Sequence, residues 1–247
     1  MAPAPIVLIP ARLASSRLPG KALLDIAGKP MILRVWESAM AAAPGPVAVA
    51  TDCPEVASVI RAAGGVAVIT RSDYACGTDR IGAAIAALDP DRRHAAVINL
   101  QGDHPVLPPG ALMTALTLLD DPDVAIGTLA ASVAASEADD PNAVKLVGAR
   151  LDAQRLRALY FTRARAPWGE GPLYRHIGVY AFRRAALERF IELPPSPLET
   201  RERLEQLRAL EAGMRIDAAL LDKAPPSVDT GQDLAAATAA AVAQDHS

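Results

Sequence analysis

The chain has 247 residues, of which 51% are hydrophobic and 21% charged, so it can bury a large core and is not intrinsically disordered. A net charge of -3 gives no broad attraction for nucleic acid, and an anionic ligand must therefore be held by a local cluster of cations. No apolar run approaches the roughly 18 residues of a membrane span, so we expect neither nucleic acid nor membrane as a partner. The two cysteines, Cys53 and Cys76, lack a Cys-x-x-Cys spacing, and no signal peptide is recognisable; both features favour a cytoplasmic protein.

Apolar runs of strand length alternate with segments of helical period in the first half of the chain. The runs predict strands at Ile6–Ile9, Val47–Ala50, Val66–Ile69 and Ala96–Leu100. Helices are predicted between them, at about Met31–Ala43, Pro54–Ala63 and Asp79–Leu88. This order indicates an α/β fold with a mostly parallel central sheet and helices on both faces. The ligand of such a sheet binds at the carboxyl ends of the strands.

The second half is less regular and predicts a smaller mixed subdomain. Its strands are expected at Val124–Val133, Ala143–Val147, Leu156–Phe161 and His176–Phe182. They are followed by a helix at Leu198–Ala212, a strand at Ile216–Leu221, the loop Lys223–Thr230 and a closing helix. We expect one domain over residues 1–247, with an inserted subdomain at about 123–215.

The first predicted strand leads into a loop that carries three cations, Arg12, Arg17 and Lys21. Small residues in this loop let backbone N–H groups approach phosphate oxygens, and Gly20 tolerates an unusual φ beside Lys21. The loop can surround a triphosphate; the alternative is a solvated basic loop. It matches neither the P-loop pattern nor the dinucleotide fingerprint, so a different nucleotide-binding fold is needed.

Three segments of this region, Ile9–Arg12, Ser16–Lys21 and Gly28–Met31, resemble the opening of the Kdo cytidylyltransferase (CMP-Kdo synthetase) family. The resemblance implies a nucleotide-diphospho-sugar transferase-like fold and a magnesium-dependent transfer of CMP from CTP to 3-deoxy-manno-octulosonate (Kdo), for lipopolysaccharide biosynthesis. It also implies that Arg12 and Lys21 contact the triphosphate and that the backbone near Ala11 lies against the nucleotide.

A second loop follows the third predicted strand and leads into a helix. Its segment Cys76–Arg80 resembles the family's Ser-Gly-Thr-Glu-Arg, with Cys76 in place of Ser and Asp79 in place of Glu. Thr78 and Asp79 are also good helix-start residues, so capping is the alternative role. The resemblance implies that Arg80 faces the acidic sugar. It further implies CTP contacts from Arg71, Asp73, Cys76 and Gly77.

Two aspartates far apart in the chain are candidate magnesium ligands. Asp103 follows the fourth predicted strand in a segment that resembles the family's Gln-Gly-Asp-Glu-Pro, with His104 in place of Glu; a turn residue is the alternative. Asp229 precedes the last helix and matches the family's Val-Asp-Thr, with helix capping as the alternative. The resemblance implies that both hold Mg²⁺ and act with Lys21 in catalysis.

The sugar side is expected in the second half of the chain. His176 and Tyr180 fall on one face of a predicted strand, where both can bond sugar hydroxyls. The resemblance adds Glu205, Gln206 and Gln101 to the sugar contacts. It also implies that the subdomain binds sugar and forms a homodimer.

Two rival functions remain open. One is a cytidylyltransferase for another acidic sugar, such as 8-amino-Kdo or a sialic-acid-like nonulosonate. The stretch between Trp168 and Arg175 is shorter than in many relatives, which puts the identity of the sugar in question. The other is a non-catalytic nucleotide-binding protein of the same fold, against which Lys21, Asp103 and Asp229 argue together.

Overall fold

A computed structural model describes residues 4–13, 18–133 and 137–245 of the chain. These residues form two compact units, one of Met1–Ala111 with Pro225–Ser247 and one of Leu112–Ala224. The predicted insert at 123–215 lies inside the second unit. In the described part of the chain, no helix has both the length and the apolar character that a bilayer crossing requires.

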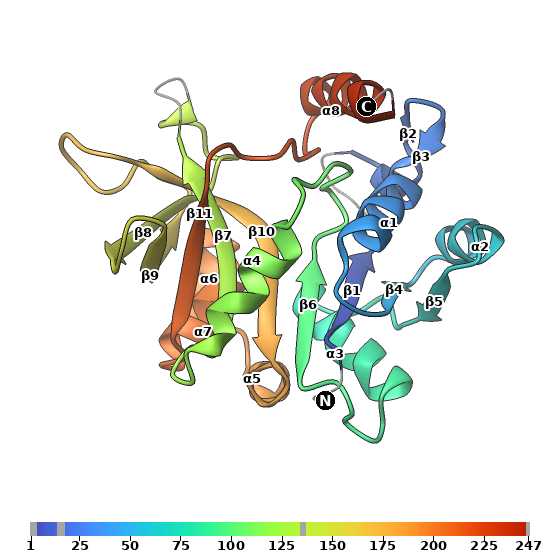
Figure 1. Ribbon diagram of the computed structural model, residues 1–247, viewed down its shortest axis with the longest axis horizontal. Helices are drawn as coiled ribbons and strands as arrows, with labels where there is room; N and C mark the ends of the chain where they lie inside the picture. Colours follow the sequence, from blue (N-terminus) through green and yellow to red (C-terminus); the bar gives the residue numbers. More distant parts are fainter. Residues whose placement is uncertain (1–3, 14–17, 134–136, 246–247) are drawn as a thin grey trace. The chain divides into compact units, whose positions relative to one another are not determined.

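Parallel strands form the sheet of the first unit, in the order β5-β4-β1-β6 (Figure 1). The strands are β1 (Ile6–Ala11), β4 (Val47–Thr51), β5 (Val66–Ile69) and β6 (Ala96–Leu100). Every residue of β1 and β4 is buried, which explains why both are continuous apolar runs rather than alternating ones. The edge strand β5 alternates instead, with Val66 and Ile69 about half exposed.

The remaining elements of this unit connect the strands and close the chain. They are η1 (Lys21–Leu23), β2 (Asp25–Ile26), β3 (Lys29–Pro30), α1 (Met31–Ala42), α2 (Pro54–Ala62), α3 (Gly77–Leu88) and α8 (Gly231–Asp245). α1 buries Met31, Ile32, Val35 and Ala39, a helical face that packs toward β1 and β4. The predicted strands and helices of this half are confirmed, with ends shifted by a few residues. The short β2–β3 hairpin was not predicted, because a two-residue strand carries no periodic signal.

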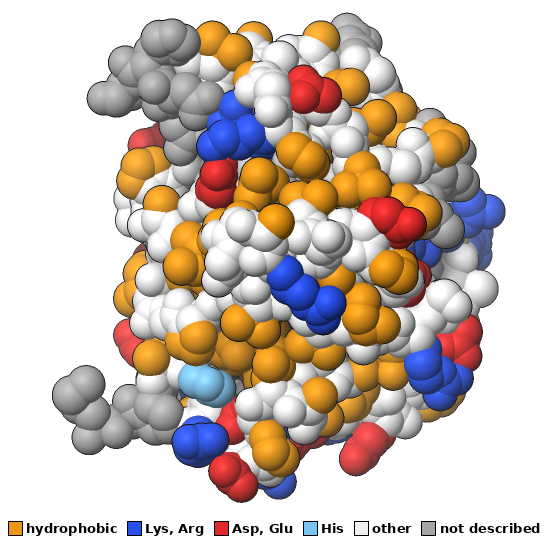
Figure 2. Space-filling model, turned by 90° about the vertical axis from the view of Figure 1, so that its right-hand side faces the viewer, with side chains coloured by type: hydrophobic (Ala, Val, Ile, Leu, Met, Phe, Trp, Pro, Cys, Tyr) orange, Lys and Arg blue, Asp and Glu red, His pale blue; other side chains and the backbone are white. Residues whose placement is uncertain are grey.

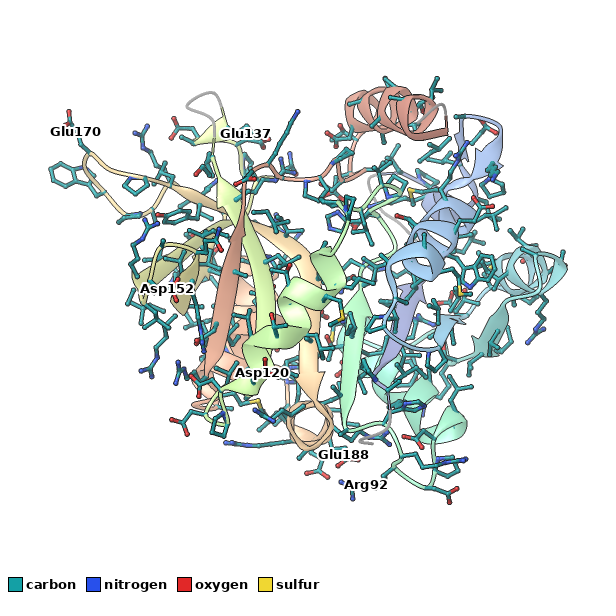
Figure 3. All side chains as sticks on the ribbon, in the orientation of Figure 1. Arg92, Asp120, Glu137, Asp152, Glu170 and Glu188 are labelled. Carbon is teal, nitrogen blue, oxygen red and sulfur yellow. The ribbon has the colours of Figure 1, made fainter. Side chains whose placement is uncertain are left out.

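Strands of mixed direction form the second unit, in the order β10-β7-β11-β9-β8, and β8 also pairs with β10. This extra pairing joins the two ends of the row. The strands are β7 (Ile126–Ser132), β8 (Lys145–Arg150), β9 (Arg155–Thr162), β10 (Tyr174–Arg183) and β11 (Ile216–Leu221). Asp152 lies at the turn between β8 and β9 (Figure 3). Strands and helices occur together in both units, so the α/β class is confirmed. The predicted strands of the second half are all present.

Short helices accompany these strands: α4 (Ala111–Thr117), η2 (Leu118–Asp120), α5 (Arg184–Glu192), α6 (Pro197–Glu202) and α7 (Gln206–Glu211). The prediction of one helix over Leu198–Ala212 is wrong. Arg203 adopts a left-handed conformation, φ 56°, which ends α6 before α7 begins. The buried Glu199–Arg208 ion pair, at 2.6 Å, then joins the two short helices.

Charged side chains are distributed over the face drawn in Figure 2 without forming one large patch of either sign. Lys and Arg side chains are interspersed with Asp, Glu and apolar side chains among those that the figure colours.

Candidate active site

Two neighbouring parallel strands of the first unit deliver the centre of the site. β1 ends at Ala11 and β6 at Leu100, so Arg12 and the segment 101–103 leave the sheet at the same edge. A Cβ atom on Gly102 would lie 2.8 Å from the carbonyl oxygen of Pro10. Glycine at this position therefore permits the close approach of the two loops.

The Lys21 ammonium joins two carboxylates from distant parts of the sequence. Its Nζ atom lies 3.0 Å from Oδ2 of Asp103 and 3.1 Å from Oδ1 of Asp229. The left-handed Gly20, φ 68°, precedes Lys21 and starts the short helix η1. The three side chains are 15%, 28% and 23% exposed, so they are shielded but accessible to a ligand. The structure thus brings together the three residues predicted to be catalytic.

Asp229 is held in place through its neighbours. The N–H of Val228 donates to the carbonyl oxygen of Asp103 at 2.9 Å, which ties the two aspartate loops together. Oδ2 of Asp233 accepts the N–H groups of Asp229 and Thr230 at 3.0 and 2.7 Å. The Thr230 hydroxyl in turn accepts the N–H of Asp233 at 3.3 Å, so Thr230 and Asp233 form the cap of α8. The carboxylate of Asp229 instead contacts Lys21.

The charges in this cluster favour an ionised Asp103. Burial alone would raise the pKa of Asp103, but the Lys21 ammonium, His104 and hydrogen bonds outweigh it and hold that pKa below its ordinary value. Nε2 of His104 lies 3.7 Å from Oδ1 of Asp103, and the His104 side chain is buried. The two carboxylates share one ammonium, so they can still accept a further cation.

A pocket of about 190 Å³ surrounds this cluster. Its lining includes three other residues predicted to bind ligand, Ala11, Arg12 and Gln101. The full lining is Pro10, Ala11, Arg12, Lys21, Ala22, Met31, Gln101, Gly102, Asp103 and Asp229. Arg17, which was predicted to contact the triphosphate, lies outside the described residues. Cationic side chains and backbone from β1 therefore share a concave surface with both aspartates.

The second loop predicted to contact CTP, here called the nucleoside loop, runs from Arg71 to Gly77 and leads into α3. Cys76 is the residue before this helix, and Gly77 is its first residue. A Cβ atom on Gly77 would lie 3.1 Å from Nε2 of Gln101, so glycine lets α3 begin directly beside that side chain. Nε of Arg71 donates to Oδ1 of Asp73 at 2.9 Å, and this exposed pair raises the pKa of Arg71 and lowers the pKa of Asp73.

Arg80 lies in the same unit but is committed to protein contacts. Its side chain is 3% exposed, and its guanidinium donates to Oδ2 of Asp52 at 2.9 Å, to the Thr70 hydroxyl at 2.5 Å and to the Arg71 carbonyl oxygen at 3.1 Å. The predicted contact between Arg80 and the sugar stays a prediction.

Sequence analysis missed Asp52. Its Oδ1 atom accepts the N–H of Leu13 at 3.3 Å, while Oδ2 binds Arg80. The Asp52 carboxylate thus connects Leu13, in the loop after β1, to Arg80, in the first turn of α3. The available signal was its place directly after the strand that ends at Thr51, at the same edge of the sheet as Arg12 and Asp103.

The predicted sugar residues of the second unit include a close pair of rings. The ring centroids of His176 and Tyr180 are 5.2 Å apart, so the two residues lie together as expected. Gln206 is 4% exposed, and its Nε2 atom has no hydrogen-bond partner within the described part of the chain. Glu205 directly precedes α7 and is partly exposed. Contact of these residues with a sugar stays a prediction.

Comparisons with known proteins point to one family. A family model described as "Cytidylyltransferase" matches residues 6–216. A 3-deoxy-manno-octulosonate cytidylyltransferase of Rhodopseudomonas palustris (strain ATCC BAA-98 / CGA009) is 60% identical over 94% of this chain and 95% of its own length. One from Methylobacterium radiotolerans is 58% identical over 95% of this chain and 96% of its own length.

Solved structures agree with this assignment. The structure of a CMP:2-keto-3-deoxy-manno-octonic acid synthetase complexed with CTP superposes with a TM-score of 0.87 at 39% identity, covering 98% of this chain and 99% of that one. An apo UDP-glucose pyrophosphorylase superposes with a TM-score of 0.69 at 16% identity over 98% and 99% of the two chains, which shows a shared fold alone. With full-length relatives of this similarity, the chain belongs to the 3-deoxy-manno-octulosonate cytidylyltransferase family.

Proposed function

We propose that the chain transfers CMP from CTP to Kdo, releasing pyrophosphate and forming CMP-Kdo for lipopolysaccharide biosynthesis. The observation that carries this proposal is the Lys21 ammonium, 3.0 Å from Asp103 and 3.1 Å from Asp229, in a pocket that Arg12 also lines. Cations there can offset charge on a triphosphate, and the paired carboxylates can hold a metal ion. Relatives that are 60% and 58% identical carry this activity in their names.

The donor set fits Mg²⁺. Mg²⁺ binds one or two protein carboxylates and completes its shell with substrate phosphates and water. Asp103 and Asp229 both contact the Lys21 ammonium, so their carboxylates face the same point. Among the described residues, no group of three or more His, Cys, Asp or Glu side chains could hold a metal ion. When bound, Mg²⁺ would offset phosphate charge and lower the pKa of the attacking hydroxyl.

The reaction follows from what these side chains can bind. The anomeric oxygen of Kdo forms a bond to the α-phosphorus of CTP, the bond from that phosphorus to the β-phosphate bridging oxygen breaks, and the hydroxyl proton passes to water. Pyrophosphate leaves with the electron pair of the broken bond. Arg12 and Lys21 bind the phosphates and offset the charge that develops on the leaving group. The backbone at Ala11 and the predicted nucleoside loop orient the nucleotide.

The second unit is proposed to supply the sugar contacts. The buried Gln206 amide supports this role, because a buried donor without a protein partner is costly unless a ligand accepts from it. His176, Tyr180 and Glu205 would bond further hydroxyls.

Pyrophosphate release tests the proposed reaction. CTP and Kdo with Mg²⁺ should give release, while ATP or UTP in place of CTP should not. 8-Amino-Kdo and a sialic acid in place of Kdo test the sugar. A preference for either would retain the chemistry and overturn the assignment of Kdo, and CTP binding without release from any pair would overturn the enzyme function.

We also propose a homodimer formed through the second unit. Leu151, Leu159 and Trp168 are 47%, 58% and 99% exposed around β8, β9 and the loop that follows, and exposed apolar groups of this kind are typical of protein contacts. Glu170 of the same loop points away from the ribbon (Figure 3). Light scattering should give twice the chain mass at micromolar concentration, and a monomer mass would contradict the proposal.

Location and the arrangement of helices complete the proposal. We propose that the activity is cytoplasmic. Cytoplasmic proteins keep their cysteines reduced, and Cys53 and Cys76 are both free thiols. Helices are proposed to cover both faces of the parallel strands, as in nucleotide-diphospho-sugar transferases.

A further inference from the structure

Three neighbouring parallel strands of the first unit end level with one another. Thr51 of β4 is in register with Ala11 of β1 on one side and with Ile69 of β5 on the other. The chain segments that follow these residues therefore leave the sheet side by side, at the carboxyl ends where an α/β fold binds its ligand. Asp52 follows the middle strand, so it lies between the segment after β1 and the segment after β5, which becomes the nucleoside loop.

The carboxylate of Asp52 bonds the segments on both sides. Its Oδ1 atom accepts the N–H of Leu13, the second residue after β1, at 3.3 Å. Its Oδ2 atom accepts from Nη2 of Arg80 at 2.9 Å. The Asp52 side chain is 12% exposed and that of Arg80 is 3% exposed, so salt and solvent screen this ion pair little. One oxygen of the carboxylate thus serves each side.

Arg80 carries the connection into the nucleoside loop. Its Nη1 atom donates to the Thr70 hydroxyl at 2.5 Å and to the carbonyl oxygen of Arg71 at 3.1 Å. A guanidinium is a planar, rigid fork, so a partner that fixes one nitrogen also fixes the direction of the others. The guanidinium carbons of Arg71 and Arg80 each lie 5.9 Å from the centre of the Tyr74 ring, in the middle of the loop. By holding Nη2, Asp52 therefore orients the group that holds the beginning of the nucleoside loop.

We propose that Asp52 is a positioning residue that holds the segment after β1 and the nucleoside loop at one relative position, so that the two halves of CTP bind together. The inference rests on the proposed function, in which Arg12 binds the triphosphate and the nucleoside loop orients the nucleotide. A ligand that spans two loops gains the full contribution of both only when their separation matches its own length. Asp52 fixes that separation through Leu13 and Arg80, without a contact to CTP.

Asp52→Asn separates this role from a general structural one. The amide keeps the size of the side chain, but it offers one acceptor atom and places an NH2 group against either the Leu13 N–H or Arg80. In calorimetric titrations with Mg²⁺ and without Kdo, the Kd of CTP should rise about tenfold. The Kd values of tripolyphosphate and of CMP, which engage mainly one loop each, should change less than about twofold.

Other results of these titrations overturn the proposal. An unchanged Kd of CTP would show that the two loops keep their positions without Asp52. An equal rise for tripolyphosphate, for CMP or for both would show that Asp52 shapes the loops separately rather than their relative position. An unaltered chain that binds CTP but releases no pyrophosphate would overturn the proposed function instead, and the Kd comparisons would still decide the role of Asp52.

Thr70→Val tests the connection through Arg80 with a milder change, and it serves if Asp52→Asn does not fold. Valine keeps the shape of this half-buried residue but removes one acceptor of the guanidinium, so the Kd of CTP should rise about threefold. Glu55→Gln is the matched control, because this exposed carboxylate lies three positions after Asp52, and it should leave the Kd of CTP unchanged. In Asp52→Asn, KM for Kdo should change less than about twofold. A Thr70→Val variant with an unchanged Kd of CTP, or a rise confined to KM for Kdo, would overturn the connection through Arg80.

Discussion

Lys21 contacts two carboxylates that lie 82 and 208 positions away along the chain. Asp103 lies just after β6, Lys21 begins the short helix η1 in the segment after β1, and Asp229 lies just before α8. In an α/β fold the ligand binds at the carboxyl ends of the strands. Their positions could therefore be predicted from sequence patterns and family resemblance. The ion pairs themselves could not, because side-chain contacts over such separations depend on the packing of the whole unit.

Replacing Asp103 with Asn tests the role of this cluster. Asn keeps the size of the side chain but removes the charge that faces Lys21 and the proposed metal ion. Turnover should fall about 10²–10³-fold, while the melting temperature changes little. The matched control is Asp123→Asn, at a carboxylate that is 82% exposed. Unchanged turnover in Asp103→Asn, measured as pyrophosphate release, would remove Asp103 from catalysis.

Arg80 and Asp52 mark the limit of prediction for single residues. The sequence places Arg80 at the start of a helix, and resemblance directs it toward a sugar, yet its guanidinium is bonded to Asp52, Thr70 and Arg71. Periodicity predicts the element that carries a long side chain, but not which of several nearby acceptors the side chain contacts.

At the scale of elements, the loops after β1 and β6 depend on one glycine. A Cβ atom on Gly102 would meet the Pro10 carbonyl oxygen at 2.8 Å, and a backbone atom cannot swing away as a side chain does. In Gly102→Ala the two loops must separate, which moves Asp103 relative to Arg12. We expect turnover to fall roughly a hundredfold and the unfolding free energy to fall by about 1–3 kcal/mol.

Gly231→Ala is the control for that variant. Gly231 begins α8 and has open space around the position of an added Cβ. Its replacement should leave turnover and the melting temperature close to those of the unaltered chain. A Gly102→Ala variant that also retains full turnover would show that the loops tolerate separation.

The broken helix shows why an element boundary can escape the sequence. Leu204, Leu207 and Leu210 have helical spacing, which predicts one continuous helix. Arg203 nevertheless adopts a left-handed conformation, and the N–H of Leu204 bonds the carbonyl oxygen of Glu199. Nothing in the residue type of Arg203 signals this, since glycine or asparagine is the usual residue there.

Glu202 fastens the end of α6 to the end of β9. Its carboxylate accepts the Thr162 hydroxyl at 2.8 Å and the Arg163 N–H at 3.0 Å. Burial raises the pKa of Glu202, but the hydrogen bonds from Arg163, Thr162 and Tyr160 outweigh it and lower the net pKa. A carboxyl whose folded-state pKa is depressed stabilises the fold above its unfolded-state pKa, and this contribution is lost as pH falls through the folded-state value.

Glu202→Gln should therefore reduce the unfolding free energy by about 1–2 kcal/mol at neutral pH. The difference from the unaltered chain should shrink as pH falls below about 4.3, the ordinary value for Glu. Thermal unfolding at a series of pH values measures it, with the exposed Glu192→Gln as control. A difference that is constant or grows toward acid would contradict the depressed pKa.

At the scale of the whole molecule, fold class was predictable from the sequence and the closure of the second unit was not. Continuous apolar runs such as β1 and β4 signal parallel strands buried on both faces. The pairing of β8 with β10 depends on segments that are distant in sequence and carry no mutual pattern. Local turns and periodicity specify hairpins such as β8–β9 far better than such closures.

The central claim, that the chain joins CMP to Kdo, is tested most directly by phosphorus-31 NMR of the reaction itself. With CTP, Kdo and Mg²⁺, the three CTP signals should give way to one phosphodiester signal and one pyrophosphate signal, and omission of Kdo should leave CTP intact. CTP signals that persist with Kdo present, or a Kdo-containing product that retains two or three linked phosphates, would contradict the account.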